Sequence, residues 1–183
     1  DEAAGRAQNR AIEGALLITL PAAAALMIIA EPAISVLFER GAFSATATAA
    51  SADALIAYAA GLPSFVMIKV LVPGYFARKD TRTPVCIAII CLTVNIVFNL
   101  ILMGPLGHVG IALATTLSGW LNAALLARGL HQRGYFTADT RLRQRTPRML
   151  LATAAMAAAL WALSAILSGP LGASLGTGVG SLL

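Results

Sequence analysis

The stretch Lys69-Val-Leu-Val-Pro-Gly-Tyr-Phe-Ala-Arg-Lys-Asp-Thr-Arg-Thr-Pro84 places a lysine within an apolar run, then a Pro-Gly break, then a basic turn. Apolar sequence continues on both sides of this segment. This order of residues is atypical of a soluble domain. Membrane helices, in contrast, tolerate Pro and Gly and end at loops rich in Lys and Arg. The segment therefore predicts two membrane spans joined by a basic turn.

The composition supports a membrane protein. Apolar residues make up 58% of the 183 residues, charged residues make up 11%, and the mean hydropathy is +0.82. Soluble domains contain about 25% charged residues. The chain begins at Asp1 without a methionine and ends on apolar residues, so we expect it to be part of a longer protein. Its length suits one helical membrane bundle and falls short of a complete transporter.

The apolar runs predict an all-α, polytopic membrane fold. We expect five full spans, at residues 15–30, 52–76, 85–103, 109–127 and 149–167, and a partial sixth span from about residue 175. Each full segment approaches the roughly 20 apolar residues that cross a bilayer. Glu31-Pro32 is expected to end the first span. Residues 128–148 are expected to form a long polar connector.

Basic residues predict the orientation of these spans. One side of the membrane carries eleven of them: Arg6, Arg10, Arg78, Lys79, Arg82, Arg128, Arg133, Arg141, Arg143, Arg145 and Arg148. The other side carries only Arg40. The positive-inside rule makes the first side cytoplasmic. The high pI of about 9.9 therefore reflects topology. A nucleic-acid surface would need a soluble basic face with interleaved aromatic residues, and the sequence contains none.

Two neighbouring spans carry polar residues that are expected to meet. Asn95 and Asn99 share a face of the third span, and Thr115, Ser118 and Asn122 share a face of the fourth. A short turn makes these spans antiparallel neighbours, so the side chains could converge in one layer. Oxygen ligands of this kind suit a hard cation such as Na⁺. The alternative is interhelical hydrogen bonding, and the two roles are compatible.

Lys69 is the ionisable residue placed deepest in a predicted span. Such a side chain usually faces a bundle interior or a water-filled cavity. Its long stem also allows the ammonium group to reach the membrane surface instead. No catalytic triad, paired catalytic carboxylates, phosphate-binding glycine loop or metal-ligand cluster is present in the sequence, so we expect no enzymatic activity.

Three segments resemble one family of transporters. The first is Lys69 to Val85, quoted above; the second is Glu31-Pro-Ala-Ile-Ser-Val-Leu-Phe-Glu-Arg-Gly-Ala-Phe43; the third is Gly104-Pro-Leu-Gly-His-Val-Gly-Ile-Ala-Leu-Ala-Thr115. Their order and spacing resemble the MurJ/MviN family of lipid II flippases, within the multidrug/oligosaccharidyl-lipid/polysaccharide exporter superfamily. The resemblance covers nearly the whole chain.

This resemblance implies a fourteen-helix transporter with two lobes, of which the chain supplies helices nine to thirteen and the start of fourteen. Such a protein moves the undecaprenyl-linked peptidoglycan precursor from the inner to the outer leaflet of the bacterial inner membrane by alternating access. Its partners would be that precursor, membrane lipids and the remaining helices. The alternatives are an exporter of a polysaccharide-lipid or a cationic drug, and a structural membrane module that transports nothing.

The resemblance also suggests site residues. Some members are thought to couple transport to a cation held between helices seven, eleven and twelve. Asn95, Asn99, Ile111 (through its carbonyl) and Thr115 occupy compatible positions. Asn99 is neutral where an acidic ligand would bind more strongly. The arginines that bind the substrate headgroup lie mainly in the first lobe and in helix eight, outside this chain. The family's last two helices form a groove for the lipid tail, and the fifth span would supply one wall.

Overall fold

The computed structural model describes residues 2–38, 44–136 and 139–168, and the regular structure within these ranges is entirely helical. The elements are α1 (Glu2–Phe38), α2 (Ala45–Ala59), α3 (Leu62–Phe76), α4 (Arg82–Gln132) and α5 (Thr140–Ser168). The predicted all-α fold class is confirmed. The partial sixth span expected from about residue 175 lies outside the described residues.

Within the described residues, four helical stretches are long and apolar enough to cross a membrane: Gly5–Phe38, Ala45–Phe76, Arg82–Gln132 and Thr140–Ile166. The third of them reverses direction, so it has a first arm (residues 82–106) and a second arm (residues 108–132). The described helices therefore contain all five apolar segments that the sequence assigns to full spans. The points at which the chain enters and leaves the membrane stay predictions.

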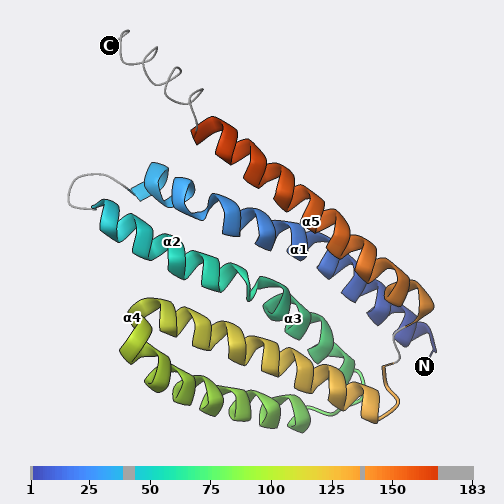
Figure 1. The fold of residues 1–183 in the computed structure, drawn as a ribbon. Coiled ribbons are helices and arrows are strands. Elements are labelled where there is room, and N and C mark those ends of the chain that lie inside the picture. Colours follow the sequence, from blue (N-terminus) through green and yellow to red (C-terminus); the bar gives the residue numbers. More distant parts are fainter. Residues whose placement is uncertain (1, 39–43, 137–138, 169–183) are drawn as a thin grey trace, which may run out of the picture.

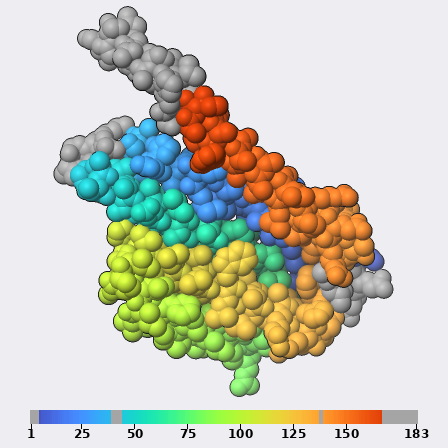
Figure 2. Space-filling model, viewed as in Figure 1, coloured from blue at the N-terminus to red at the C-terminus, as the bar shows by residue number. Residues whose placement is uncertain are grey.

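The helices lie side by side across the bundle (Figure 1). α5 packs against α1, α1 packs against both α2 and α3, and these two pack against α4. The space-filling view in Figure 2 shows α4 gathered at one side of the molecule and α5 at the other. The chain is thus a layered bundle in which α5 has α1 as its main neighbour.

The reversal in α4 depends on two glycines. Gly107 has φ 55° and ψ −131°, a conformation that side-chain-bearing residues rarely adopt. Gly110 lets the two arms come close, because a Cβ atom there would lie 2.2 Å from the carbonyl oxygen of Leu102. The hairpin therefore forms at the Gly-rich turn predicted between the third and fourth spans.

The span predicted at residues 52–76 contains a break in its helix, between α2 and α3. Pro63, near the start of α3, has no amide hydrogen and so cannot donate a helical backbone hydrogen bond across the junction. Side chains of the second arm bind two carbonyls at the break. The Thr116 hydroxyl donates to Ala57 at 2.7 Å, and the Trp120 indole donates to Ala60 at 3.0 Å. Such partners allow membrane helices to tolerate a break.

The interruption of the first helix expected at Glu31-Pro32 is wrong. α1 continues through Pro32 to Phe38, because proline removes one hydrogen bond and the flanking turns remain intact. The polar connector at residues 128–148 is mostly helical, since α4 reaches Gln132 and α5 starts at Thr140. Asp139 caps α5 by accepting a hydrogen bond from the backbone amide of Leu142 at 2.7 Å.

The best-packed part of the bundle is the end that carries the start of α1, the turn at residues 77–81 and the junction of α4 with α5. We refer to it as the basic end. Its buried cluster joins four helices through Ile12, Leu71, Tyr75, Leu126, Leu130 and Leu142. The Tyr75 hydroxyl, at the centre of the cluster, donates to the carbonyl of Leu126 at 2.7 Å. This contact joins α3 to the second arm of α4.

An ion pair closes the turn at the basic end. Asp80 pairs with Arg133, just beyond α4, and Arg133 also donates to the Thr83 hydroxyl at 2.9 Å. The Thr83 amide donates to Asp80 Oδ1 at 3.0 Å. This amide is the main reason that the pKa of Asp80 lies below its usual range. The Thr83 hydroxyl and Arg133 act in the same direction, and partial burial opposes them.

We expect Thr116→Val in the full-length protein to lower stability by about 1–2 kcal/mol, because it leaves the carbonyl of Ala57 without its side-chain donor. Thermal unfolding in detergent measures the change. The control is Thr93→Val, since Thr93 is exposed and bonds only to Ile89 in its own helix. Equal melting temperatures for the two variants would contradict a bridging role for Thr116.

Asp80→Asn should destabilise the full-length protein at neutral pH. The difference in stability between this variant and the wild type should become smaller as the pH falls. A carboxylate whose pKa is lowered by folding adds stability above its unfolded pKa of about 3.9, and this stability disappears as the pH falls through the folded pKa. Unfolding measured between pH 7 and pH 3 tests the trend. Asp53→Asn removes an exposed carboxylate and serves as the control. A pH-independent effect of Asp80→Asn would contradict the linkage.

Candidate functional site

The predicted polar layer forms a chain of hydrogen bonds between the two arms of α4. Asn99 Nδ2 donates to Asn95 Oδ1 at 2.9 Å, and Asn95 Nδ2 donates to Ser118 Oγ at 3.0 Å. Ser118 Oγ donates to the carbonyl of Thr115 at 3.0 Å, and Thr115 Oγ1 donates to the carbonyl of Ile111 at 2.9 Å. The structure thus brings together the residues that the sequence placed in one layer.

The layer borders a cavity of about 260 Å³ between α3 and both arms of α4. Its polar lining consists of Asn95, Thr115, Ser118 and Asn122. Asn99 Oδ1 is buried and has no hydrogen-bond partner, so it keeps its capacity as an acceptor. All of these groups are neutral oxygen or amide groups, which suit a weakly held hard cation and cannot neutralise its charge. A cation site at Asn95, Asn99, Ile111 and Thr115 stays a prediction.

Lys69 lies on an exposed face of α3 and lines a second cavity, of about 490 Å³. The opposite wall comes from α1 through Ala7, Gln8 and Ala11. This cavity is at the basic end, so Lys69 does not contact the polar layer of α4. The role of Lys69 as a cavity residue stays a prediction for the whole protein.

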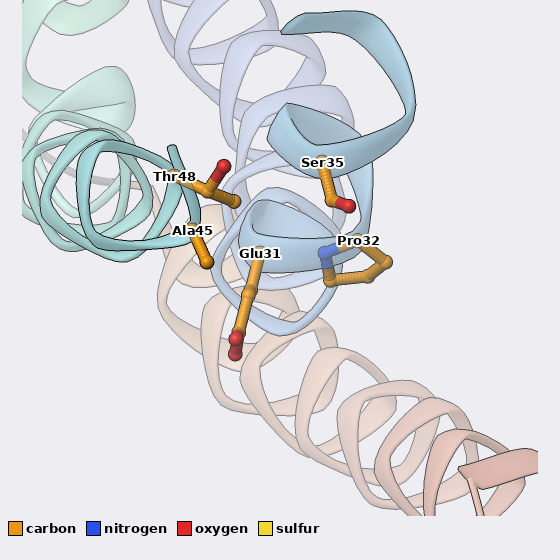
Figure 3. A pocket seen from close by; sticks show the side chains of 5 residues that line it. All are labelled: Glu31, Pro32, Ser35, Ala45 and Thr48. Atoms are coloured by element: carbon orange, nitrogen blue, oxygen red, sulfur yellow. The ribbon is translucent and has the colours of Figure 1, made fainter. Parts of the chain in front are cut away.

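A third cavity, of about 400 Å³, lies between the end of α1 and the start of α2. Figure 3 shows its lining, with Glu31, Pro32 and Ser35 on α1 and Ala45 and Thr48 on α2. Glu31 was expected only to help end the first helix, and instead it borders this cavity. One carboxylate with two hydroxyls is a sparse ligand set for a metal ion.

The sequence interpretation missed a buried carboxylate. Glu13 on α1 is only 9% exposed, and it pairs with Arg141 and Arg145 on α5. Arg141 Nε donates to Glu13 Oε2 at 3.2 Å. The two arginines are four residues apart, which places them on one face of a helix. That spacing, and the position of Glu13 just before an apolar run, are signals from which the pair could have been predicted.

The comparison with known proteins identifies the family. The chain matches the family model described as lipid II flippase MurJ over residues 1–176. The chain belongs to the MurJ family. A probable lipid II flippase MurJ of Rhizobium meliloti is 48% identical over 158 residues, which cover 86% of this chain and 30% of that protein. The corresponding protein of Vibrio cholerae is 44% identical over 141 residues, which cover 77% and 27% of the two chains.

The fold agrees with this family. A solved structure described as lipid II flippase MurJ in an inward closed conformation matches with a TM-score of 0.69 and 25% identity. The match covers 92% of this chain and 40% of that one. The chain is therefore a polytopic helical segment of the MurJ fold, and it spans about 30% of the length of the Rhizobium meliloti relative.

We expect Asn95→Ala in the full-length protein to reduce stabilisation by Na⁺, because it removes an oxygen of the polar layer. Melting temperatures measured in NaCl and in choline chloride at equal ionic strength give the sodium-dependent shift. Thr116→Val should lower the overall melting temperature and keep that shift, since Thr116 binds Ala57 outside the layer. If the wild-type protein melts at the same temperature in both salts, the polar layer serves packing alone.

Proposed function

We propose that this chain is part of the second lobe of a transporter that flips lipid II from the inner to the outer leaflet of the bacterial inner membrane. The observation that carries the proposal is the MurJ family match over residues 1–176. The relatives named as probable lipid II flippases support it at up to 48% identity. The protein would work by alternating access and would move its substrate without changing a covalent bond.

The basic end of the bundle would face the cytoplasm. The start of α1, the turn at residues 77–81 and the junction of α4 with α5 all lie there and carry most of the basic residues. The positive-inside rule favours this orientation. The packed cluster of Ile12, Leu71, Tyr75, Leu126, Leu130 and Leu142 would then lie near the cytoplasmic surface and hold the helices together as the lobes rock.

α5 would supply one wall of a groove for the lipid tail. Its membrane part exposes large apolar side chains, among them Leu150, Leu151, Trp161 and Ile166. α5 is held to α1 near its basic start by Leu142 and by the two arginines on Glu13. An isoprenoid tail fits such an apolar surface because the tail has no polar group that would need a hydrogen-bond partner. The remaining helices of the transporter would complete the groove.

The polar layer of α4 would be the part of this lobe that responds to Na⁺. Asn95, Asn99, the carbonyl of Ile111 and Thr115 lie along one hydrogen-bond chain, and Asn99 Oδ1 still lacks a donor. A charged ligand from another helix would be needed for firm binding, since these four groups are neutral. Na⁺ coupling is therefore the part of the proposal that depends most on the rest of the protein.

The full-length gene should restore growth to a bacterial strain depleted of its own lipid II flippase. The same protein in liposomes should move fluorescent lipid II between leaflets and should leave a fluorescent phospholipid in place. An inactive control is Glu13→Arg, because a third cation beside Arg141 and Arg145 should separate α5 from α1. A wild-type protein that is present in the membrane and neither restores growth nor moves lipid II would refute the proposal.

A further inference from the structure

The cavity between α1 and α3 has an unusual chemical lining. It lies at the basic end, holds about 490 Å³ and is bordered mostly by small or apolar side chains such as Ala7, Ala11, Val70 and Pro73. Its polar lining residues are Gln8, Lys69 and Arg78, and none of the lining residues is acidic. A cavity with apolar walls, two cations and no carboxylate favours an anionic group attached to an apolar one.

Lys69 carries a positive charge that the described part of the chain does not neutralise. No hydrogen bond or ion pair joins Lys69 to another residue of the described part of the chain. Two carboxylates at the basic end have other partners, because Glu13 pairs with Arg141 and Arg145 and Asp80 pairs with Arg133. A cation on a membrane helix is costly unless it meets a counter-charge or water. Lys69 is thus available to an anion that enters the cavity.

Gln8 provides a second donor from the opposite wall. Its Nε2 atom is buried and has no acceptor among the described residues. Gly74 makes room for this amide, because a Cβ atom at residue 74 would lie 2.6 Å from Gln8 Nε2. A buried N–H group without a partner destabilises the protein, so an acceptor placed in the cavity would be stabilised there.

Arg78 adds a fixed cation at the rim of the cavity. Its guanidinium donates to the carbonyl of Gly74 at 2.9 Å and to that of Tyr135 at 3.4 Å. It also lies over the Tyr135 ring, 4.3 Å from the ring centroid. These contacts hold the charge in place before any ligand arrives. The rim therefore attracts anions towards Lys69 and Gln8.

We propose that this cavity is an anion subsite that receives the phosphate of the lipid substrate at the basic end, with Lys69 and Gln8 as its direct donors. The inference rests on the proposed function, because the phosphate belongs to the lipid that the transporter moves. Charge-assisted hydrogen bonds from Lys69 bind the phosphate oxygens. The apolar walls receive the first carbons of the tail. Arg78 orients the approaching headgroup through its charge.

Binding of a short isoprenyl diphosphate to the full-length protein in detergent tests the subsite. Lys69→Gln should weaken this binding at least about tenfold, since a hydrogen bond from a charged group is lost. Lys69→Arg should retain most of the affinity. Gly74→Ala should weaken binding as well, because its methyl group displaces the Gln8 amide. Melting temperatures of all variants show whether each one is folded.

The matched control is Lys79→Gln, which removes the same charge at the same end of the bundle. Lys79 is exposed and lies outside the cavity lining. Its loss should leave the affinity for the isoprenyl diphosphate within about twofold, because exposed charges are screened by salt. Equal weakening by Lys69→Gln and Lys79→Gln would overturn the subsite, since only general electrostatic attraction would then remain.

Two further ligands distinguish a lipid-attached phosphate from a free phosphate as the occupant of the cavity. Inorganic diphosphate should bind far more weakly than the isoprenyl diphosphate, and an isoprenyl alcohol should be insensitive to Lys69→Gln. Equal binding of inorganic diphosphate would overturn a lipid occupant. Failure of the wild-type protein to move lipid II would refute the proposed function. Normal binding and transport by the Lys69→Gln protein would refute only the subsite.

Discussion

A bilayer contains no water that could bind a backbone group released from a helix, so each break must find its partner within the protein. The junction of α2 and α3 meets this constraint through Thr116 and Trp120, which bind the carbonyls of Ala57 and Ala60. These two donors are four residues apart and so share one face of the second arm of α4. Further towards the basic end, Tyr75 binds the carbonyl of Leu126. The three bonds fix how α4 lies against α2 and α3.

The two ends of the bundle pack in different ways. At the basic end, large side chains from four helices form a cluster, and ion pairs at Glu13 and Asp80 surround it. Towards the opposite end, α1 and α2 bury small side chains such as Ala30 and Ala52. Small residues allow helices to approach closely, and they do not interlock as branched or aromatic side chains do. The basic end is therefore the part best suited to move as one body.

The sequence predicted the fold class and the polar layer, because both depend on local patterns. Runs of apolar residues identify membrane helices, and the spacing of Asn95 and Asn99 places them on one face whatever surrounds them. Helix ends were predicted less well. Pro32 does not end α1, and Asp139 starts α5 inside a segment taken for a connector. Packing between helices explains the start of α5, since Leu142 is buried against other helices. The partners of Glu13 and Gln8 also depend on packing between distant segments.

The direction of the hydrogen bonds in α4 shows how one set of residues can serve both packing and ion binding. The chain of bonds runs from Asn99 through Asn95 and Ser118 towards Ile111, and the amide oxygen of Asn95 accepts one hydrogen bond in it. The carbonyl oxygens of Thr115 and Ile111 each accept a side-chain hydroxyl in addition to a backbone amide of the helix. A side-chain amide oxygen has two lone pairs, so Asn95 Oδ1 keeps one for a cation and Asn99 Oδ1, which has no partner, keeps both. The two asparagine oxygens can thus meet an ion while the hydrogen bonds stay in place, whereas an ion on the carbonyl of Ile111 would displace one of its two hydrogen bonds. What the chain of bonds lacks is negative charge, which has to come from outside the layer.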